Sequence, residues 1–542
     1  MKNNSDSSRD SLNRRTFLRS GAVTETALIL TSKDTAKSAP HPDPFPLLET
    51  GITEMAAGLQ SGRWTVKDLT QWYLHRIESI DSSGPSLGSV IEVNPEALAI
   101  AEVLDKERKV RGSRGPLHGI PILLKDNLDT ADRMKTTAGS LALKDAPPPQ
   151  ADAFLVGKLR KAGALILGKT NLSEWANFRS TRSISGWSGR GGQTRNPYAL
   201  DRNPSGSSSG SAVAVAANLC AAAIGTETDG SIVSPANNCG VVGLKPTVGL
   251  LSRSGIIPIA HSQDTAGPIT RSVRDAAILL SILAGSDPRD LLTQSTPAGL
   301  SPDYTRFLAA DGLKGARIGI LQNLLGKHTH VDKIMKNAWD TLRRSGATLV
   351  EVVHRSQPYE DAELEVLLYE FKTGLNGYLQ ARGGSVDDLT SLIAFNEKYR
   401  AAEMPYFEQE ILLQAQEKGP LTEKKYLEAL AACRKLCRSE GLDVLMVKNR
   451  LDALAAPTGS PAWLTDPING DSYGISCSTP AAVAGYPHIT VPAGFVFGLP
   501  VGLSFFGRPW SEPMLIQFAY AFEQTTRIRR PPQFAAGAST GA

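Results

Sequence analysis

The chain has 542 residues, of which 41% are hydrophobic and 21% charged, and this is the ordinary composition of a globular enzyme. The length allows one large domain or several smaller ones. The 58 Lys and Arg residues nearly balance 54 Asp and Glu residues, without a long basic stripe, so the charge gives no argument for a nucleic-acid partner. Five scattered cysteines do not predict a disulfide framework or a metal site. No apolar run is long enough for a membrane span.

The N-terminal segment resembles an export signal. Residues 13–19 (NRRTFLR) resemble a twin-arginine motif, a mildly apolar stretch follows at 21–31, and small residues at 36–39 offer a cleavage site. We therefore expect residues 1–38 to be a leader and the protein to be periplasmic if the leader functions, or cytoplasmic otherwise. The alternative is a basic disordered tail, which Glu25 inside the apolar stretch favours.

The body of the chain alternates helical and strand patterns. Residues 52–80 have helical periodicity. Residues 154–161 predict a helix that a glycine ends, and a short apolar strand follows at 164–167; residues 334–344 and 347–353 repeat this order. A helix followed by a glycine and a buried strand is typical of an α/β unit, so we expect a sheet covered by helices on both faces.

The C-terminal half continues this pattern. Residues 364–437 are charged and amphipathic and predict a helical cover, whereas 453–457 and 489–492 predict strands that end at prolines. Residues 515–525 predict a closing helix. No clear boundary divides the body, so we expect one large α/β domain over residues 45–535.

Three segments could carry chemistry. In residues 119–127 (GIPILLKDN), a short apolar strand delivers Lys125 at its end. In residues 204–211 (PSGSSSGS), a Ser/Gly loop leads into a helix of small residues. In residues 224–232 (IGTETDGSI), a polar turn rich in glycine lets backbone N–H groups approach a substrate oxygen near Ser231. Each segment alone also has an ordinary interpretation, namely a snorkelling lysine, a flexible linker and a simple polar turn.

Taken together and in this order, the segments resemble the amidase signature family. Residues 203–247 fit the Ser/Gly-rich region of that family, including 241–247 (VVGLKPT), and the resemblance extends over about residues 49–531. Within the family, residues 171–178 (NLSEWANF) and 191–197 (GGQTRNP) are most similar to bacterial peptide amidase, which removes the C-terminal amide from peptides. The resemblance implies a fold with a central mixed β-sheet.

The resemblance also implies the roles of individual residues. The family's lysine falls on Lys125, its bridging serine with a cis peptide bond on Ser207, and its nucleophile on Ser231. Ser208, beside the bridging serine, is expected to support its hydrogen bonding. The oxyanion hole is expected to consist of backbone N–H groups in one turn, those of Thr228, Asp229, Gly230 and Ser231.

These roles make one demand on Lys125. A lysine can accept the proton of a serine only as the neutral amine, so its pKa must fall by about 3 from the usual value of about 10.4. The apolar run before Lys125 predicts the burial that would lower the pKa. We expect hydrolysis of a carboxamide by water, with no metal or organic cofactor and no nucleic acid, in a protein that is a monomer.

Four positions depart from the common family pattern. Asp229 stands where the family usually has glycine, and Val233 stands where many members have arginine. Ser205 and Ser209 replace glycines of the loop. Because the catalytic hydroxyls are retained, the departures affect which substrate is bound rather than the chemistry.

Four other functions stay open. One is a general amidase for small amides, and another is an amidotransferase subunit that passes ammonia to a partner acting on aminoacylated transfer RNA. Residues 206–210 also match the G-x-S-x-G elbow of α/β-hydrolases, which would need a histidine base such as His488. A non-enzymatic alternative is an anion-binding cradle, but the loop lacks the G-K-[ST] ending of a phosphate loop.

Overall fold

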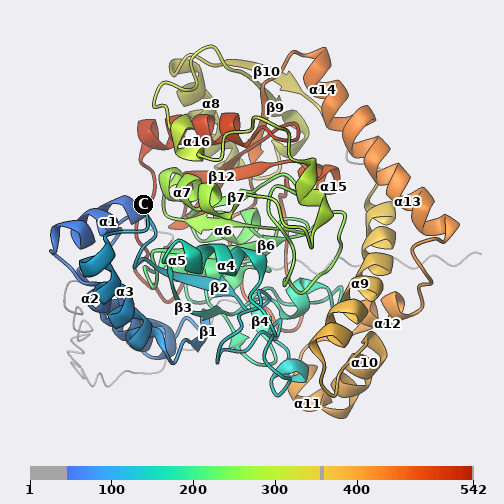
Figure 1. Ribbon diagram of the computed structural model, residues 1–542. Coiled ribbons are helices and arrows are strands. Elements are labelled where there is room, and N and C mark those ends of the chain that lie inside the picture. The colour runs from blue at the N-terminus through green and yellow to red at the C-terminus, as the bar shows by residue number, and fades with distance from the viewer. Residues whose placement is uncertain (1–44, 355–358, 540–542) are drawn as a thin grey trace, which may run out of the picture. The chain divides into compact units, whose positions relative to one another are not determined.

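The computed structural model describes residues 45–354 and 359–539, and the predicted leader, residues 1–38, lies outside them. In the described residues, eleven strands form one sheet in the order β1-β3-β2-β6-β8-β7-β12-β13-β11-β9-β10, which runs from the bottom to the top of Figure 1. The strands are β1 (Val90–Val93), β2 (Pro121–Lys125), β3 (Leu165–Thr170), β6 (Ala222–Glu227), β7 (Val242–Lys245), β8 (Thr265–Thr270), β9 (Arg317–Leu321), β10 (Thr348–Val352), β11 (Ala453–Pro457), β12 (His488–Val496) and β13 (Leu499–Phe506). A separate small hairpin consists of β4 (Trp187–Ser188) and β5 (Gly192–Gln193).

The sheet is mixed. Strand β2 runs parallel to both β3 and β6, and β9 runs parallel to both β10 and β11. The strands between these two parallel regions pair antiparallel, with the long β12–β13 hairpin among them. This confirms the predicted α/β class with a central mixed sheet.

Helices flank the sheet. In the described residues they are α1 (Ile52–Ser61), α2 (Val66–Arg76), α3 (Ala97–Arg111), α4 (Phe154–Lys161), α5 (Ser209–Ala216), α6 (Val233–Asn238), α7 (Val273–Leu283), α8 (Thr329–Arg344), α9 (Glu360–Arg382), α10 (Leu389–Lys398), α11 (Arg400–Glu403), α12 (Glu410–Gln416), α13 (Lys424–Arg434), α14 (Asp443–Lys448), α15 (Thr479–Ala484) and α16 (Glu512–Thr526). Helices α5 and α6 pack together against the strands, whereas α4, α7, α8 and α16 pack in a second group. Two separate groups on one sheet agree with helices on both faces.

Most predicted elements are present. The helices expected at 154–161 and 515–525 are α4 and α16, and the helical cover expected at 364–437 is α9 to α13, which lie together at one side of the molecule in Figure 1. Residues 45–539 form part of one compact unit, in agreement with a single large domain. No helix in the described part of the chain has the length and apolar character that a bilayer crossing needs.

The helical stretch predicted at residues 52–80 is present but is divided into two helices. Residues 52–80 do not form a continuous helix, because α1 ends at Ser61 and α2 begins at Val66. The Thr65 side chain accepts a hydrogen bond from the Asp68 N–H, and the Asp68 carboxylate accepts one from the Thr65 N–H. This capping box starts a new helix, and its pattern of Thr followed three residues later by an acid is visible in the sequence.

Candidate active site

The candidate site lies where parallel strands end. Lys125 is the last residue of β2, and Thr226 lies near the end of the neighbouring strand β6. Because β2 and β6 run parallel, their carboxyl ends meet at the same edge of the sheet. The Lys125 Nζ atom therefore reaches Thr226 directly, at 2.9 Å from its Oγ1 atom and 3.2 Å from its carbonyl oxygen.

The Lys125 amine is surrounded by neutral oxygens. Its Nζ atom lies 2.7 Å from the Ser207 Oγ atom and 3.0 Å from the Ser208 Oγ atom, in addition to its contacts with Thr226. The side chain is fully buried, and none of the ion pairs in the described residues includes Lys125. A buried amine without a carboxylate partner loses the hydration of its charge and receives no ion pair in return.

This environment favours the neutral amine. Burial lowers the pKa of Lys125 to about 7, although the negative charges of Glu227 and Asp264 oppose the change. The apolar run before Lys125 predicts this burial correctly. Near neutral pH, a large fraction of the amine is therefore available as a proton acceptor.

Ser207 and Ser208 stand directly before the first turn of α5. The peptide bond between Gly206 and Ser207 is cis, as the family resemblance implies. The Ser208 hydroxyl donates to the Thr226 carbonyl oxygen over 3.0 Å, and the Ser208 N–H donates to the Ser231 carbonyl oxygen over 3.1 Å. Ser208 thus ties the lysine, β6 and the turn that carries Ser231 into one unit.

Close packing at this point requires a glycine. A Cβ atom on Gly225 in β6 would lie 2.8 Å from the Ser208 Oγ atom, which is closer than ordinary packing allows. Gly225 therefore lets the hydroxyl of Ser208 approach the strand backbone.

The turn that follows β6 carries Ser231, which is 8% exposed. In the described residues, none of the hydrogen bonds uses the backbone N–H of Thr228, Asp229, Gly230 or Ser231 as its donor. These N–H groups are therefore available for a substrate oxygen, as an oxyanion hole requires. The Ser231 hydroxyl makes no hydrogen bond to Ser207 within the described residues. Of the predicted proton relay from Ser231 through Ser207 to Lys125, the structure therefore contains only the hydrogen bond between Ser207 and Lys125.

Hydrogen bonds from buried side chains fix the position of this turn. The Glu227 carboxylate accepts hydrogen bonds from the N–H groups of Ile232 (2.7 Å) and Val233 (3.0 Å), at the start of α6. The Thr228 hydroxyl donates to Asp264 over 2.6 Å. Asp264 in turn accepts from the backbone N–H groups of the loop before it, so the turn is tied to that loop.

Gln263 joins the turn to the helical cover. Its Nε2 group donates to the Glu363 Oε1 atom on α9 over 2.8 Å and to the Thr228 carbonyl oxygen over 3.4 Å. The Thr228 carbonyl and the Asp229 N–H belong to the same peptide group, so a hydrogen bond at the carbonyl fixes the direction of that N–H.

A cavity of about 250 Å³ opens beside the turn. Its walls include Asn127, Thr226 and Thr228 at the site and the aliphatic stretch 256–259 farther away. The rest of the lining is polar or charged and includes Glu227, Arg253 and Asp264, so an aliphatic wall faces polar groups, as in many small-molecule and peptide side-chain sites.

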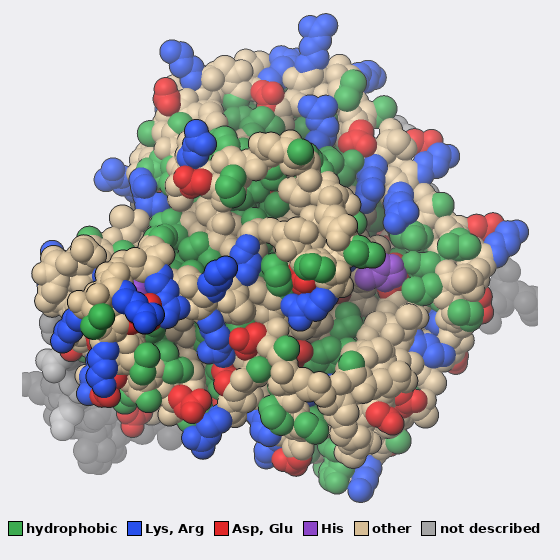
Figure 2. Space-filling model, viewed as in Figure 1, with side chains coloured by type: hydrophobic (Ala, Val, Ile, Leu, Met, Phe, Trp, Pro, Cys, Tyr) green, Lys and Arg blue, Asp and Glu red, His purple; other side chains and the backbone are tan. Residues whose placement is uncertain are grey.

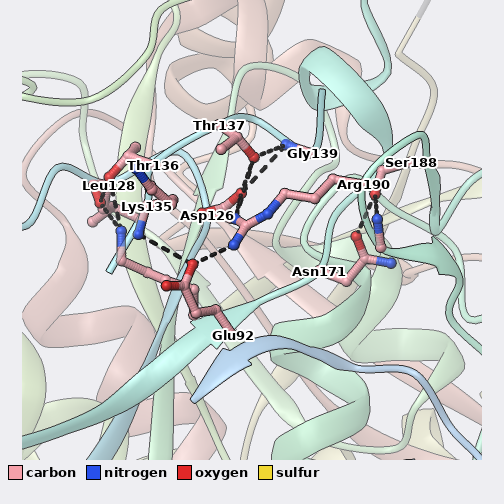
Figure 3. A network of polar contacts seen from close by, with 12 residues as sticks. Glu92, Asp126, Leu128, Lys135, Thr136, Thr137, Gly139, Asn171, Ser188 and Arg190 are labelled. Atoms are coloured by element: carbon pink, nitrogen blue, oxygen red, sulfur yellow. Dashed lines mark hydrogen bonds and ion pairs between the residues drawn. The ribbon is translucent and has the colours of Figure 1, made fainter. Parts of the chain in front are cut away.

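The opposite side of the β2 end has a different chemistry. Asp126, which follows Lys125, is fully buried and accepts hydrogen bonds from Thr137 and from Arg190, whose second partner is Glu92 (Figure 3). The Asp126–Arg190 ion pair has an N–O distance of 3.2 Å. These charges compensate one another, and we assign this network to the stability of the site rather than to its chemistry.

The comparisons with known proteins agree with this geometry. A family model described as Amidase matches residues 68–516. The chain belongs to the amidase signature family. Peptide amidase from Stenotrophomonas maltophilia has a similar structure, with 53% identity and a TM-score of 0.87 over 91% of this chain and 100% of that one.

Other members of the amidase family are also similar. A probable amidase of Arabidopsis thaliana is 43% identical over 507 residues, which cover 91% of this chain and 93% of that protein. A glutamyl-tRNA(Gln) amidotransferase subunit from Moorella thermoacetica is 35% identical, over 86% of this chain and 94% of that protein. The chain is an amidase family enzyme that hydrolyses amides.

Two departures from the common family pattern lie close to Ser231 in the sequence. Val233, where many amidase family members have arginine, is 1% exposed and brings no positive charge to the start of α6. Asp229 is half-buried, and its Oδ1 atom has no hydrogen-bond partner in the described residues. Burial raises the pKa of Asp229.

The α/β-hydrolase interpretation finds no support in the geometry. His488 is buried in β12, where its Nε2 atom lies 2.6 Å from the Ser504 Oγ atom, and it makes no hydrogen bond to Ser208, the central serine of the G-x-S-x-G match. Burial lowers the pKa of His488 to about 3, which is too low for a general base at neutral pH. Ser208, the serine at the nucleophile position of the motif, follows a loop rather than a strand.

The sequence did not single out several contact residues of the site. Thr226 and Glu227 lie inside the segment 224–232, but their roles depend on which face of β6 each side chain takes. Gln263 and Glu363 are a hundred residues apart and carry no local signal of their contact. The five cysteines are buried and free, and the described residues contain no cluster of His, Cys, Asp and Glu that could hold a metal ion.

Proposed function

We propose that this protein hydrolyses the C-terminal carboxamide of peptides to a free carboxylate and ammonia, through an acyl-enzyme on Ser231. The observation that carries the proposal is the buried Lys125 amine, which has no acidic partner in the described residues and lies 2.7 Å from the Ser207 Oγ atom. A lysine in this environment can act as a base near neutral pH, whereas an ion-paired lysine cannot.

In the first half of the reaction, Ser231 attacks the carboxamide carbon. Its proton passes to the Ser207 oxygen while the Ser207 proton passes to the Lys125 amine. The carbonyl oxygen becomes negative and is stabilised by the free N–H groups of residues 228–231. The Lys125 ammonium then returns a proton through Ser207 to the leaving nitrogen, and ammonia departs.

In the second half, water attacks the acyl-enzyme. The same pair of groups accepts the proton of the water and returns it to the Ser231 oxygen, which releases the carboxylate product. The hydroxyl contact between Ser231 and Ser207 must close when substrate binds, because catalytic hydrogen bonds often tighten only in the complex.

Two observations support a peptide substrate. The chain is 53% identical to Stenotrophomonas maltophilia peptide amidase, with full coverage of that chain. The cavity beside residues 226–228 has an aliphatic wall at residues 256–259 and room for a side chain next to the scissile amide.

The test is ammonia release from amidated dipeptides, compared with simple aliphatic and aromatic amides. We expect the amidated dipeptides to be the better substrates and Ser231→Ala to reduce kcat by at least about four orders of magnitude. Hydrolysis of only the simple amides would contradict the peptide assignment. Near-normal turnover by the Ser231→Ala variant would contradict the acyl-enzyme.

We also propose that the full chain is exported when residues 13–19 act as a twin-arginine signal. Fractionation of a bacterial host should place the protein in the periplasm, and replacing Arg14 and Arg15 by Lys should keep it in the cytoplasm. An unchanged location of the double variant would contradict this assignment.

A further inference from the structure

A second cavity adjoins the one beside the candidate site. It has a volume of about 440 Å³ and lies between the end of α13, the end of α15 and the loops near residues 247 and 510. It shares the wall residues Arg253 and His261 with the first cavity, so these two side chains lie between the two spaces.

The wall of this second cavity is basic. No Asp or Glu residue lines it within the described part of the chain, whereas its polar and aromatic lining includes Arg253, His261, Arg434, Arg438, Tyr486 and Trp510. Figure 2 shows Lys and Arg side chains and a histidine on the face of the molecule that also carries α13 and α15. The cavity therefore presents positive charge to any ligand that enters it.

Two of these basic groups already have acidic partners. Arg253 makes an ion pair with Asp290 over 2.5 Å, and the His261 Nδ1 atom lies 3.3 Å from the Glu370 carboxylate. These residues contribute little net positive charge to the cavity.

The other two arginines have no acidic partner. In the described residues, neither Arg434 nor Arg438 takes part in an ion pair. Arg438 is nevertheless held in place, because its Nε group donates to the Ala484 carbonyl oxygen over 2.8 Å and its guanidinium group lies 5.8 Å from the Tyr486 ring centre. Its Nη groups donate to no acceptor among the described residues and remain available.

Arg434 and Arg438 both line the second cavity. Arg434 ends α13, and Arg438 lies one turn later in the π-helix η7 (Lys435–Leu442), so both reach one side of this helical segment. The Ser262 hydroxyl, a buried wall group without a hydrogen-bond partner in the described residues, offers a further donor. Positioned guanidinium groups with free N–H donors match a carboxylate, which can accept two parallel hydrogen bonds.

We propose that this second cavity is a subsite for a carboxylate on the peptide substrate, carried by an acidic residue upstream of the amidated end. The inference rests on the proposed function. The shared wall of the two cavities favours a group of the substrate over an unrelated ligand. A free anion has the same chemistry, and the experiment below distinguishes it from the substrate.

The experiment uses the full-length protein and amidated peptides in which a single Glu is moved residue by residue away from the amide. Each peptide has a partner with Gln at the same position, and kcat/KM is measured by ammonia release. We expect Glu to be preferred over Gln by about five-fold at one position, through KM rather than kcat. Arg434→Gln and Arg438→Gln should each reduce that preference, while neutral peptides are hydrolysed at the usual rate.

The matched control is Lys424→Gln, which removes one positive charge from the same helix at a side chain that is 87% exposed and does not line the cavity. This variant should keep the preference for Glu. Arg434 is exposed, so its replacement tests the proposal even if Arg438→Gln fails to fold.

The outcomes separate the two proposals. Equal rates for Glu and Gln peptides at every position, with neutral peptides still hydrolysed, would overturn the subsite and leave the proposed function intact. If inorganic phosphate raises the Tm of the wild type but not of Arg438→Gln, and no position prefers Glu, the cavity binds a free anion and the substrate assignment is overturned. If no amidated peptide releases ammonia, the proposed function fails and the subsite fails with it.

Discussion

Lys125 and Asp126 are consecutive residues at the end of β2, and both are fully buried, but they face opposite environments. The Lys125 amine forms hydrogen bonds only with hydroxyl groups and a carbonyl oxygen. Asp126 forms an ion pair with the guanidinium group of Arg190, which also forms an ion pair with Glu92 (Figure 3). Burial without an ion-pair partner in the described residues lowers the pKa of Lys125 to about 7, into the range where an amine can exchange protons.

The comparison separates two uses of a buried charge. A charge within an ion-pair network stabilises local structure, because its partners replace the water that was lost. A charge without such partners destabilises the fold or becomes neutral, and such a group persists where its protonation is useful. We therefore expect replacements of Lys125 and Asp126 to have opposite effects on activity and stability.

Of the replacements that test this comparison, the largest effect on kcat should come from Lys125→Met, which keeps the length of the side chain and removes the base. We expect kcat to fall by about three orders of magnitude or more, because general acid–base catalysis contributes on that scale. The free energy of unfolding should stay the same or rise, since a costly polar group leaves the core. Steady-state ammonia release and urea unfolding measure the two effects. A large loss of stability would mean that Lys125 has a structural role like that of Asp126.

The second effect should come from Asp126→Asn, which leaves Arg190 with only Glu92 as its acidic partner in the described residues. Breaking a buried ion pair typically costs about 3 kcal/mol in the free energy of unfolding. We expect a loss of that order, with kcat changed by less than about tenfold at a temperature where the variant is folded. The matched control is Glu92→Gln, which should cost less because Glu92 is partly exposed. A selective loss of kcat at normal stability would contradict the comparison.

A smaller effect should come from Gln263→Leu, which removes the donor to the Thr228 carbonyl oxygen. If this donor directs the Asp229 N–H at the oxyanion, we expect kcat to fall about tenfold with little change in KM. Inhibition by a peptide aldehyde, which forms a tetrahedral adduct with a serine, should weaken by a similar factor. With neutral amidated peptides, which carry no carboxylate for the proposed subsite, Ser262→Ala is the control, because the Ser262 hydroxyl has no hydrogen-bond partner among the described residues. A change in KM alone would show that Gln263 contributes to substrate binding instead.

The sequence predicted the chemistry near Lys125 better than the contacts that position it. The apolar run 120–124 indicates burial of the lysine, and the order of the three segments leads to Ser207 and Ser231 by family resemblance. The contact of Lys125 with Thr226 depends on the register between β2 and β6, which are about a hundred residues apart. Local periodicity does not specify such a register.

The fold shows the same division between local and distant information. The helices and strands with clear periodicity, such as α4 and β3, lie where the pattern predicts them. The break between α1 and α2 was missed although the Thr65 and Asp68 capping signal is local. The Gln263–Glu363 contact could not be predicted, because it depends on how α9 packs against a loop far away in the sequence.

The most direct test of the account is a titration of the Lys125 side-chain amine by nitrogen-15 NMR, with Lys125→Met used to assign the signal. The amine should lose its proton with a midpoint near pH 7, because its pKa is about 7 in the folded protein. The pH dependence of kcat/KM should then rise through the same range, since the neutral amine is the active form. A Lys125 amine that stays protonated above pH 9 while the enzyme is fully active at pH 7 would contradict the account.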